Sequence, residues 1–463
     1  ARRCRSGGAA QPWVFRARGR AAAAEGKSRP VLQPHRVPVI VIVGGGFAGI
    51  AVARRLERRL RPSEAEIVLL SRDNYSLFTP MLPEVASGEV EVRHIVTPIR
   101  AQVQRTRFVL ADVDAIDVHG KKVTYHHVLT GRTVVQPYDD VVLALGSSTS
   151  DFGLPGIAEH TWALKTLEDA DALRNHLAWL LELADTIDDD ARRDRLLTIV
   201  VVGGGFTGVE TAGEVTEMLR DVLRFYRRLN AKRLHVILIE AGPTLLAGLP
   251  PKMGEYSRRI LERRGIEVLT GNGVTGADER GLTLQSGRRI ETETIVWSAG
   301  VKPSPTIARV DLPKTKRGAI ETRSDMRVPS ADGVWALGDC AAIPDELEGG
   351  VYPMTAQHAI REGPHLADNI VAVLRGKPTK PFLYRALGMM AALGGRKAVA
   401  ELPGGHVMTG FIAWFFWRTY YLLRLPGLDR KVRVAFDWTL ELIFPRDTAE
   451  LRFGEREEDS RQR

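Results

Sequence analysis

The sequence predicts an α/β protein that contains one strand–turn–helix unit twice, and two observations support this prediction. Nearly the same ten residues occur twice, as VIVGGGFAGI at 41–50 and as VVVGGGFTGV at 200–209. Each copy starts with β-branched apolar residues, which are typical of a buried parallel strand, and a helical pattern follows. Each unit also ends in an apolar strand that closes at a glycine, in YDDVVLALGSSTS and RIETETIVWSAG. The whole unit is therefore duplicated, and not only its turn.

Both copies contain the spacing G-x-G-x-x-G, which suits a turn around a pyrophosphate. The first glycine allows the tight turn, the second leaves room for the phosphates, and the third lets helix and strand pack closely. The phosphates would face the N–H groups at the helix N-terminus, where the dipole is positive. The glycines are Gly44, Gly46 and Gly49 in the first copy and Gly203, Gly205 and Gly208 in the second.

The end of the second strand in each unit predicts how the ribose is bound. In the second unit the strand LHVILIE ends at Glu240, whose carboxylate accepts a ribose 2′-hydroxyl and repels a 2′-phosphate. This site is therefore predicted to prefer NADH over NADPH. In the first unit the corresponding position is Ser71, followed by Arg72 and Asp73. Either Ser71 bonds a hydroxyl weakly or Asp73 takes its place.

Composition predicts two or three domains for 463 residues and does not predict nucleic-acid binding. The net charge is +9, but residues 1–38 hold nine Lys/Arg and one Glu, so the remainder carries only +1. The basic segment lacks an apolar h-region and is not a secretory signal. We expect a disordered extension over 1–37, with organelle targeting or an anion-binding arm as alternatives.

Two cysteines, Cys4 and Cys340, have no spacing that suits a metal or a redox-active pair. Cys340 is expected to be a packing residue. It lies in the segment GVWALGDCAAIP, directly after an apolar strand that ends in Gly338–Asp339. Asp339 is placed there to reach a sugar or ribityl hydroxyl. A helix is predicted after it, in TAQHAIREGPHLADNIVAVLRG.

The C-terminal segment has the pattern of a helix pair that lies on a membrane. FIAWFFWRTYYLLRL at 411–425 is apolar and aromatic, but it is short and holds Arg418 and Arg424, so a bilayer span is not predicted. In the following helix the polar residues form one narrow stripe and the apolar residues line the opposite side. The stripe comprises Arg430, Arg433, Asp437 and Glu441, and the apolar side comprises Val432, Ala435, Phe436, Leu440 and Ile443. A dimer interface or a lid on the core is the alternative.

The ordered set of motifs resembles the flavoprotein oxidoreductases with two dinucleotide-binding domains over 38–385, and the type II NADH dehydrogenases over 38–447. The segments that carry the closer resemblance are NYSLFTPMLPEVASG, TGVETAGEV, GDCA, AQHAIREG and WRTYYLLRLPGLDRKVRVAFDWTLELIFPRD. The resemblance implies two Rossmann-like domains, with the FAD domain interrupted by the NAD domain, and an amphipathic membrane-binding segment. The implied boundaries are 1–37 (disordered extension), 38–160 and 306–385 (FAD domain), 161–305 (NADH domain), 386–450 (membrane binding and dimerisation) and 451–463 (disordered tail).

The resemblance also implies the residues of the sites. Glu210 would lie near the nicotinamide–flavin contact, and Gln357 near the flavin and the quinone; a purely structural role is the alternative for both. Non-covalent FAD would be bound by Gly44, Gly46, Gly49, Ser71, Arg72, Thr79, Pro80, Gly146 and Asp339, and NADH by Gly203, Gly205, Gly208, Glu240 and Gly300. The family often has glutamine where this chain has Arg361 and Thr79, and a Tyr-Gln pair where it has Pro83–Glu84. These departures concern the quinone side.

The implied activity is a non-proton-pumping NADH:quinone oxidoreductase of the respiratory chain, without a metal. Its partners would be a membrane quinone, a lipid surface bound through about 409–445, and a second copy of the chain. The implied location is the cytoplasmic face of the bacterial inner membrane, with mitochondria as the alternative. A soluble flavoprotein reductase with another acceptor and a flavin-bound NADH sensor are the competing hypotheses. A sulfide:quinone oxidoreductase is disfavoured because the redox cysteines are missing.

Overall fold

A computed structural model describes residues 36–444, 446 and 449. The predicted disordered extension at 1–37 and the tail at 451–463 fall almost entirely outside the described residues. The description below concerns the unit from Val37 onward. Its mixed α/β architecture confirms the predicted fold class.

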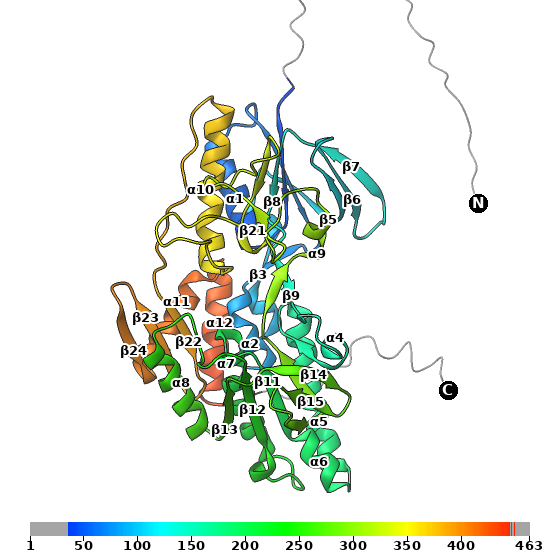
Figure 1. The fold of residues 1–463 in the computed structure, drawn as a ribbon, viewed down its shortest axis with the longest axis vertical. Coiled ribbons are helices and arrows are strands. Elements are labelled where there is room, and N and C mark those ends of the chain that lie inside the picture. Colours follow the sequence, from blue (N-terminus) through cyan, green and yellow to red (C-terminus); the bar gives the residue numbers. More distant parts are fainter. Residues whose placement is uncertain (1–35, 445, 447–448, 450–463) are drawn as a thin grey trace, which may run out of the picture. The chain divides into compact units, whose positions relative to one another are not determined.

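The first sheet has seven strands in the order β20-β8-β1-β2-β5-β6-β7 (Figure 1). The strands β20, β8, β1, β2 and β5 run parallel, whereas β6 and β7 are antiparallel additions. Helix α1 packs against α10, which returns to this sheet from late in the chain. The bounds are β1 Val39–Val43, α1 Phe47–Arg59, β2 Glu66–Ser71, β5 Arg107–Asp117, β6 Lys122–His127, β7 Thr133–Pro137, β8 Asp140–Leu143, β20 Val334–Ala336 and α10 Ala356–Leu374.

The second sheet has five parallel strands in the order β10-β17-β11-β12-β13. A three-stranded antiparallel sheet, β14-β15-β16, belongs to the same part of the chain. Because this part lies between β8 and β20 in the sequence, it interrupts the first sheet, as predicted. The bounds are β10 Trp162–Ala163, α5 Leu167–Thr186, β11 Thr198–Val202, α7 Phe206–Leu223, β12 His235–Glu240, α8 Pro251–Arg263, β13 Ile266–Thr270, β14 Val274–Asp278, β15 Gly281–Leu284, β16 Arg289–Glu291 and β17 Thr294–Trp297.

Short elements connect the two sheets. The exit strands continue into an antiparallel pair, β9 with β18, and β3 pairs with β4 ahead of α3. The small elements are β3 Tyr75–Leu77, a 3₁₀ turn Thr79–Met81, α2 Leu82–Ala86, a 3₁₀ turn Val92–Ile95, β4 Val96–Pro98, α3 Ile99–Gln102, β9 Ser147–Thr149, α4 Ile157–His160, a 3₁₀ turn Ala231–Arg233, β18 Val301–Pro303, α9 Pro305–Ala308, β19 Ile320–Glu321, a 3₁₀ turn Gly338–Cys340 and β21 Ala341–Ala342.

The acidic-then-basic stretch DDDARRDR contributes to a helix, α6 Asp190–Leu196. Asp189 begins it by accepting a hydrogen bond from the Arg192 backbone N–H. The buried Arg193 guanidinium then donates to the carbonyl of Ala184, at the end of α5. Capping and this tertiary contact outweigh the polar composition.

The C-terminal part packs on the core of the second sheet. It forms a three-stranded sheet and two helices: β22 Met389–Ala392, β23 Ala398–Leu402, β24 His406–Thr409, α11 Gly410–Arg424 and α12 Leu428–Glu441. Trp417 of α11 and Val434 and Trp438 of α12 are buried in the same apolar cluster as α5 and α7. Among the helices that the structure describes, none is long and apolar enough to cross a membrane.

Candidate functional site

The first glycine turn lies between β1 and α1. Two of the three glycines in its G-x-G-x-x-G spacing, Gly44 and Gly49, leave no room for a side chain, whereas the middle one, Gly46, faces open space. Gly44 has φ +114°, and a Cβ there would stand 2.2 Å from the carbonyl oxygen of Ala144. A Cβ at Gly49 would stand 1.9 Å from the carbonyl oxygen of Gly44. At Gly46, by contrast, no described atom lies within 4 Å of the Cβ position. The space beside Gly46 is therefore available to a ligand at the start of α1.

The second turn, between β11 and α7, repeats this geometry. Gly203 has φ +112°, and its Cβ would stand 2.7 Å from the carbonyl carbon of Ser298. A Cβ at Gly208 would stand 1.8 Å from the carbonyl oxygen of Gly203, whereas the Cβ position of Gly205 is free of described atoms within 4 Å. Two glycine turns of the same shape therefore occur in one chain, each at a helix N-terminus of the kind that suits a phosphate.

The strand ends beside the two turns differ. Glu240 lies at the end of β12 and binds the turn directly: one carboxylate oxygen accepts the Gly204 N–H at 2.6 Å, and the other accepts the Gly242 N–H at 2.6 Å. Ser71 occupies the matching place at the end of β2, and its Oγ would be 2.6 Å from a Cβ at Gly45.

The two residues that follow Ser71 lie in different environments. Arg72 is exposed, whereas Asp73 is partly buried, and this burial raises the pKa of its carboxyl group.

Asp339 forms a polar cluster at the end of β20. Its Oδ2 accepts a hydrogen bond from Ser147 Oγ at 2.6 Å, and Lys165 Nζ lies 3.6 Å from the same oxygen. Lys165 Nζ also donates to Ser147 Oγ at 2.8 Å. Sequence reasoning missed Lys165, because its only local feature is that it precedes the N-cap Thr166.

Gly146 and Gly300 lie at the ends of the two exit strands but differ in their surroundings. Gly146 has φ +65° and open space at its Cβ position. At Gly300 a Cβ would meet the ring of Phe152 at 2.5 Å. The strands leaving them pair as β9 and β18, and the Ser150 N–H donates to the carbonyl of Gly300 at 3.0 Å.

Glu362 on α10 contacts the strand that carries Asp339. The carboxyl group is 3% exposed, and its Oε2 accepts the Gly338 N–H at 2.7 Å. Burial raises the pKa of Glu362 to about 7, although the hydrogen bond from Gly338 opposes this shift. The sequence places Glu362 beside Arg361 but gives no sign that it is buried.

Gln357 near the start of α10 is bound to the loop that leads into the C-terminal part. Its Oε1 accepts hydrogen bonds from Tyr384 Oη at 2.9 Å and from the Leu387 N–H at 3.0 Å. Its Nε2 donates to the carbonyl of Gly388 at 3.2 Å. Arg361 donates to the Gln357 carbonyl at 3.0 Å, and its guanidinium lies 4.7 Å from the centre of the Tyr384 ring. The Gln357 amide thus fixes this loop.

Glu210 on α7 is 7% exposed and faces the C-terminal part. Its Oε1 accepts the Ala392 N–H at 3.0 Å and Trp417 Nε1 at 3.2 Å. Burial raises the pKa of Glu210 to about 8, against the effect of these two hydrogen bonds. The carboxyl group is therefore mostly protonated at neutral pH.

Thr79 and Pro80 lie in a 3₁₀ turn and are partly buried. The neighbouring Phe78 makes edge contacts with Phe47 at the start of α1, at 5.9 Å between ring centres, and with Tyr421 of α11, at 6.1 Å. The loop NYSLFTP therefore joins the first glycine turn to the C-terminal helices.

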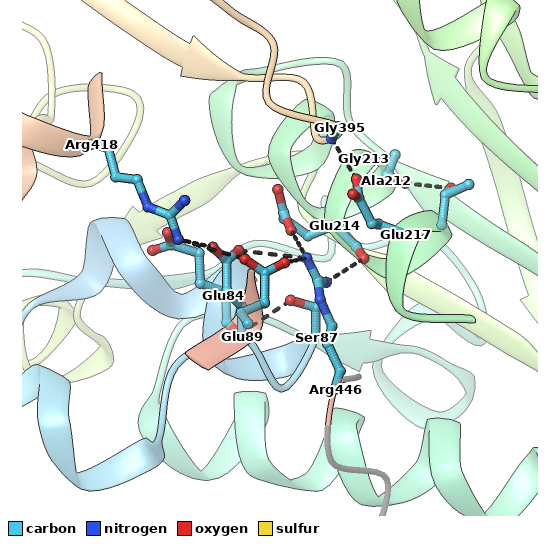
Figure 2. Close-up of polar contacts among 12 residues, drawn as sticks. Glu84, Ser87, Glu89, Ala212, Gly213, Glu214, Glu217, Gly395, Arg418 and Arg446 are labelled. Carbon is cyan, nitrogen blue, oxygen red and sulfur yellow. Dashed lines mark hydrogen bonds and ion pairs between the residues drawn. The ribbon is translucent and has the colours of Figure 1, made fainter. Parts of the chain in front are cut away.

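A buried charge cluster joins α7 to the C-terminal helices. Figure 2 shows Arg418 and Arg446 among the acids Glu84, Glu89 and Glu214. Arg418 pairs with Glu89 at 2.8 Å, and Arg446 pairs with Glu214 at 2.8 Å and with Glu441 at 3.1 Å. Sequence reasoning missed these pairs.

The exposed side of the C-terminal helices is apolar. On α12, Val432, Phe436 and Leu428 are between 61% and 77% exposed, and α11 exposes Phe411, Ile412 and Phe415. Two acidic residues of α12 lie toward the protein instead: Asp437 pairs with His94 at 2.5 Å, and Glu441 joins the buried cluster. Arg433 of the same predicted stripe is exposed. The predicted stripe is present, and its acidic part faces inward.

The sequence predicted that Cys340 is a packing residue and that the protein has no metal site. Cys340 is buried, its thiol donates to the carbonyls of Leu143 and Leu337 at 3.3 Å, and burial raises its pKa to about 12. A thiol in this state packs and does not react. Within the described part of the chain, His, Cys, Asp and Glu form no group suited to a metal ion.

Comparisons with known proteins agree with this arrangement. Residues 38–363 match the family "Pyridine nucleotide-disulphide oxidoreductase", and residues 387–447 match "NDH2 C-terminal domain". The chain is 34% identical to the type II NADH:quinone oxidoreductase Ndh of Mycobacterium tuberculosis, covering 91% of each chain. It is 32% identical to the internal alternative NAD(P)H-ubiquinone oxidoreductase A1 of Arabidopsis thaliana mitochondria, covering 89% of this chain and 86% of that one. NDH2 of Plasmodium falciparum, solved in complex with NADH, has a similar fold, with a TM-score of 0.83 at 19% identity over 89% of this chain and 100% of that one.

Proposed function

The chain belongs to the type II NADH:quinone oxidoreductases, and we propose that it oxidises NADH and reduces a membrane quinone through a non-covalently bound FAD, without pumping protons. The observation that carries the proposal is the pair of glycine turns with the same geometry and the same open middle position, at Gly46 and Gly205. One chain with two such turns has room for two dinucleotides, as electron transfer from NADH to a flavin requires.

The residues around Gly46 fit FAD. The open space beside Gly46 and the N-terminus of α1 suit the pyrophosphate. The carboxylate of Asp339, held by Ser147 and Lys165, is an acceptor for a flavin-side hydroxyl. Thr79, Pro80 and Gly146 would border the same space, with Ser71, Arg72 or Asp73 toward the ribose. FAD, when bound, accepts a hydride at N5 and releases the electrons to a second substrate.

The residues around Gly205 suit NADH. Glu240 is fixed by two backbone N–H groups, so its carboxylate keeps one orientation beside the turn. There it accepts a ribose hydroxyl and repels a 2′-phosphate. Gly300 would lie near the nicotinamide half, where the Phe152 ring covers it.

Two side chains of this protein would serve the acceptor reaction. Reduction of a quinone to a quinol by NADH consumes one proton beyond the hydride. Glu210 holds a proton at neutral pH, and because both donors bind Oε1, the proton belongs on Oε2. Gln357 would act by holding the 384–388 loop over the site.

The exposed apolar side of α11 and α12 supports peripheral membrane binding through about 409–445. Burying these residues in the lipid interface would bring a lipid-soluble quinone to the C-terminal part. A homodimer through part of the same surface is compatible with this. We place the protein at the cytoplasmic face of the bacterial inner membrane, or alternatively in mitochondria.

The first test measures NADH oxidation by the FAD-loaded protein in detergent, with and without a soluble quinone, and with NADPH as a parallel donor. Quinone-stimulated NADH turnover with little use of NADPH is expected. Flavin reduction without quinone turnover would contradict the proposal. It would favour another acceptor or a flavin-bound NADH sensor, with Arg361 beside Gln357 as the first residue to vary.

A further inference from the structure

A basic cavity lies beneath the turn between α11 and α12, away from the residues assigned to the two dinucleotides and the quinone. Its volume is about 800 Å³. Its walls come from α1, from the β4–α3 segment and from the turn 425–431. Five cations line it, against two carboxylates; the cations are Arg54, Arg58, Arg105, Arg430 and Lys431.

The two carboxylates offset this charge only partly. Glu57 accepts hydrogen bonds from the backbone N–H groups of Gln104, Arg105 and Thr106 and from Thr106 Oγ1, so it is used to hold the loop before β5. Asp429 lies 3.4 Å from Nε of Arg430 and is largely exposed. The cavity therefore keeps a positive character.

Two of the cations have side chains without a partner among the described residues. Arg54 and Arg58 are exposed along one side of α1, and their side chains make no hydrogen bond or ion pair with any residue that the structure describes. Arg430 is partly engaged: its Nε lies 3.4 Å from Asp429 without a hydrogen bond, and its NH1 donates to the carbonyl of Arg93 at 3.2 Å.

The cavity wall is held in place by its own contacts. Thr97 Oγ1 donates to the carbonyl of Pro426 at 3.3 Å, and Lys431 Nζ donates to the carbonyl of Leu423 at 2.8 Å. These bonds fix the turn and the cation at its end. This part of the wall therefore needs little ordering when an anion enters, which favours binding.

The exposed apolar surface begins on the same turn. Leu428 stands between the lining residues Gly427 and Asp429 and is 77% exposed, and Leu423 and Val432 on either side are 66% and 61% exposed. The cations of the cavity and the exposed apolar surface therefore adjoin at the turn 425–431.

From this we infer that the cavity binds the phosphate headgroup of an anionic phospholipid, whose acyl chains lie along Leu423, Leu428 and Val432. The inference rests on the proposed membrane binding and adds to it a preference for negatively charged lipid. Basic groups at a membrane surface attract anionic lipids, and a fixed group of cations at the headgroup level strengthens this attraction. A quinone is neutral and carries no negative charge to pair with the five cations, so it is not the expected occupant.

The test uses the full-length, FAD-loaded protein and the double variant Arg54→Gln/Arg58→Gln. The matched control is Arg309→Gln/Arg317→Gln, which removes the same charge from two exposed arginines that do not line the cavity. Flotation with vesicles of phosphatidylcholine alone, and with one fifth phosphatidylglycerol, measures binding. We expect the wild type and the control to bind the anionic vesicles at least about tenfold more tightly than the neutral ones, and the cavity variant to lose most of this preference.

Two further measurements separate the possible failures. Inorganic phosphate at the same phosphate concentration as the lipid should not displace the vesicles; full displacement would identify a phosphate site and overturn the lipid assignment. Equal loss in the control and the cavity variant would also overturn it. NADH oxidation with a soluble quinone needs no membrane, so normal turnover without lipid preference refutes this inference alone, whereas absent turnover refutes the proposed function.

Discussion

Glu210 Oε1 accepts a hydrogen bond from the indole Nε1 of Trp417 at 3.2 Å, across 207 positions of the sequence. The carboxyl group belongs to the helix that begins at the second glycine turn, and the indole belongs to the apolar C-terminal helix α11. The helix of the second glycine turn and the C-terminal helices with the exposed apolar side therefore meet at one buried carboxyl group.

This contact predicts a pH dependence of stability. The unfolded chain releases the Glu210 proton near its ordinary pKa of 4.5, whereas the folded chain holds it to about pH 8. Between these values the folded state binds more protons, so the contribution of Glu210 to the free energy of unfolding falls as pH rises, by up to about 1.4 kcal/mol per pH unit. Glu210→Gln should be less sensitive to pH in this window. Urea unfolding at pH 5.5 and pH 8 measures the difference.

The control for this measurement is Glu159→Gln, which removes an exposed carboxylate. It should keep the pH slope of the wild type. A slope that is the same in all three proteins would show that Glu210 ionises normally and would contradict the assignment of a stored proton.

Glu240→Gln should relax the choice between the two nicotinamide cofactors. The variant removes the negative charge that repels a 2′-phosphate, while one amide oxygen still accepts a backbone N–H. We expect the ratio of kcat/KM for NADH over NADPH to fall by about tenfold or more, which corresponds to about 1.4 kcal/mol. Steady-state kinetics with both donors measure this ratio. Glu279→Gln, an exposed acid elsewhere, should leave it unchanged, and an unchanged ratio in Glu240→Gln would remove Glu240 from the ribose site.

The sequence predicted the glycine turns because their requirements are local. Gly44 and Gly203 need positive φ, and Gly49 leaves no room for a Cβ, so spacing alone identifies them. The position of Glu240 follows from counting along one βαβ unit. The partners of Arg418 and Arg446 could not be predicted in this way: Glu89 is 329 positions from the first, and Glu214 is 232 positions from the second. Such pairs are set by tertiary packing, which leaves no periodic pattern in the sequence.

The orientation of the C-terminal helices could not be predicted from the sequence either. Periodicity predicted the polar stripe on α12, but it could not say which surroundings each side would meet. In the structure Val434 and Trp438 are buried, but Asp437 also faces inward to contact His94, while Phe436 is 62% exposed. An ordinary surface helix would expose the acid and bury the phenylalanine. Only the contacts of the folded chain reveal this orientation.

Gly46→Ala and Gly49→Ala should separate FAD binding from folding. Ala at position 46 meets no described atom within 4 Å and has a permitted φ of −79°, so the protein should fold with an unoccupied FAD site. The new methyl group would stand where the pyrophosphate approaches, so FAD affinity should fall by about tenfold or more. Flavin absorbance after gel filtration measures retention.

Gly49→Ala is the matched comparison. Its Cβ would overlap the Gly44 carbonyl oxygen at 1.9 Å, so strand and helix must separate. We expect a loss of about 3 kcal/mol or more in stability, with poor expression. Normal FAD retention in Gly46→Ala would contradict the placement of FAD at the first turn.

Arg446→Met should destabilise the attachment of the C-terminal helices. The guanidinium is 2% exposed and pairs with Glu214 and Glu441, and it lies 3.6 Å from Glu89. Its removal leaves the buried Glu214 carboxylate without its cation, and leaves Glu89 and Glu441 with Arg418 alone. Breaking a buried ion pair in this way typically costs about 3–5 kcal/mol. The double variant Arg446→Met/Glu214→Gln removes one of these charges as well and should recover part of the loss. Arg433→Met, an exposed arginine on α12, is the control and should change stability by less than about 0.5 kcal/mol.

Limited proteolysis between β24 and α12, compared with thermal unfolding of the whole protein, distinguishes local release of the helices from global unfolding. If Arg446→Met resists proteolysis as well as Arg433→Met does, the buried cluster does not hold the C-terminal helices on the nucleotide-binding part.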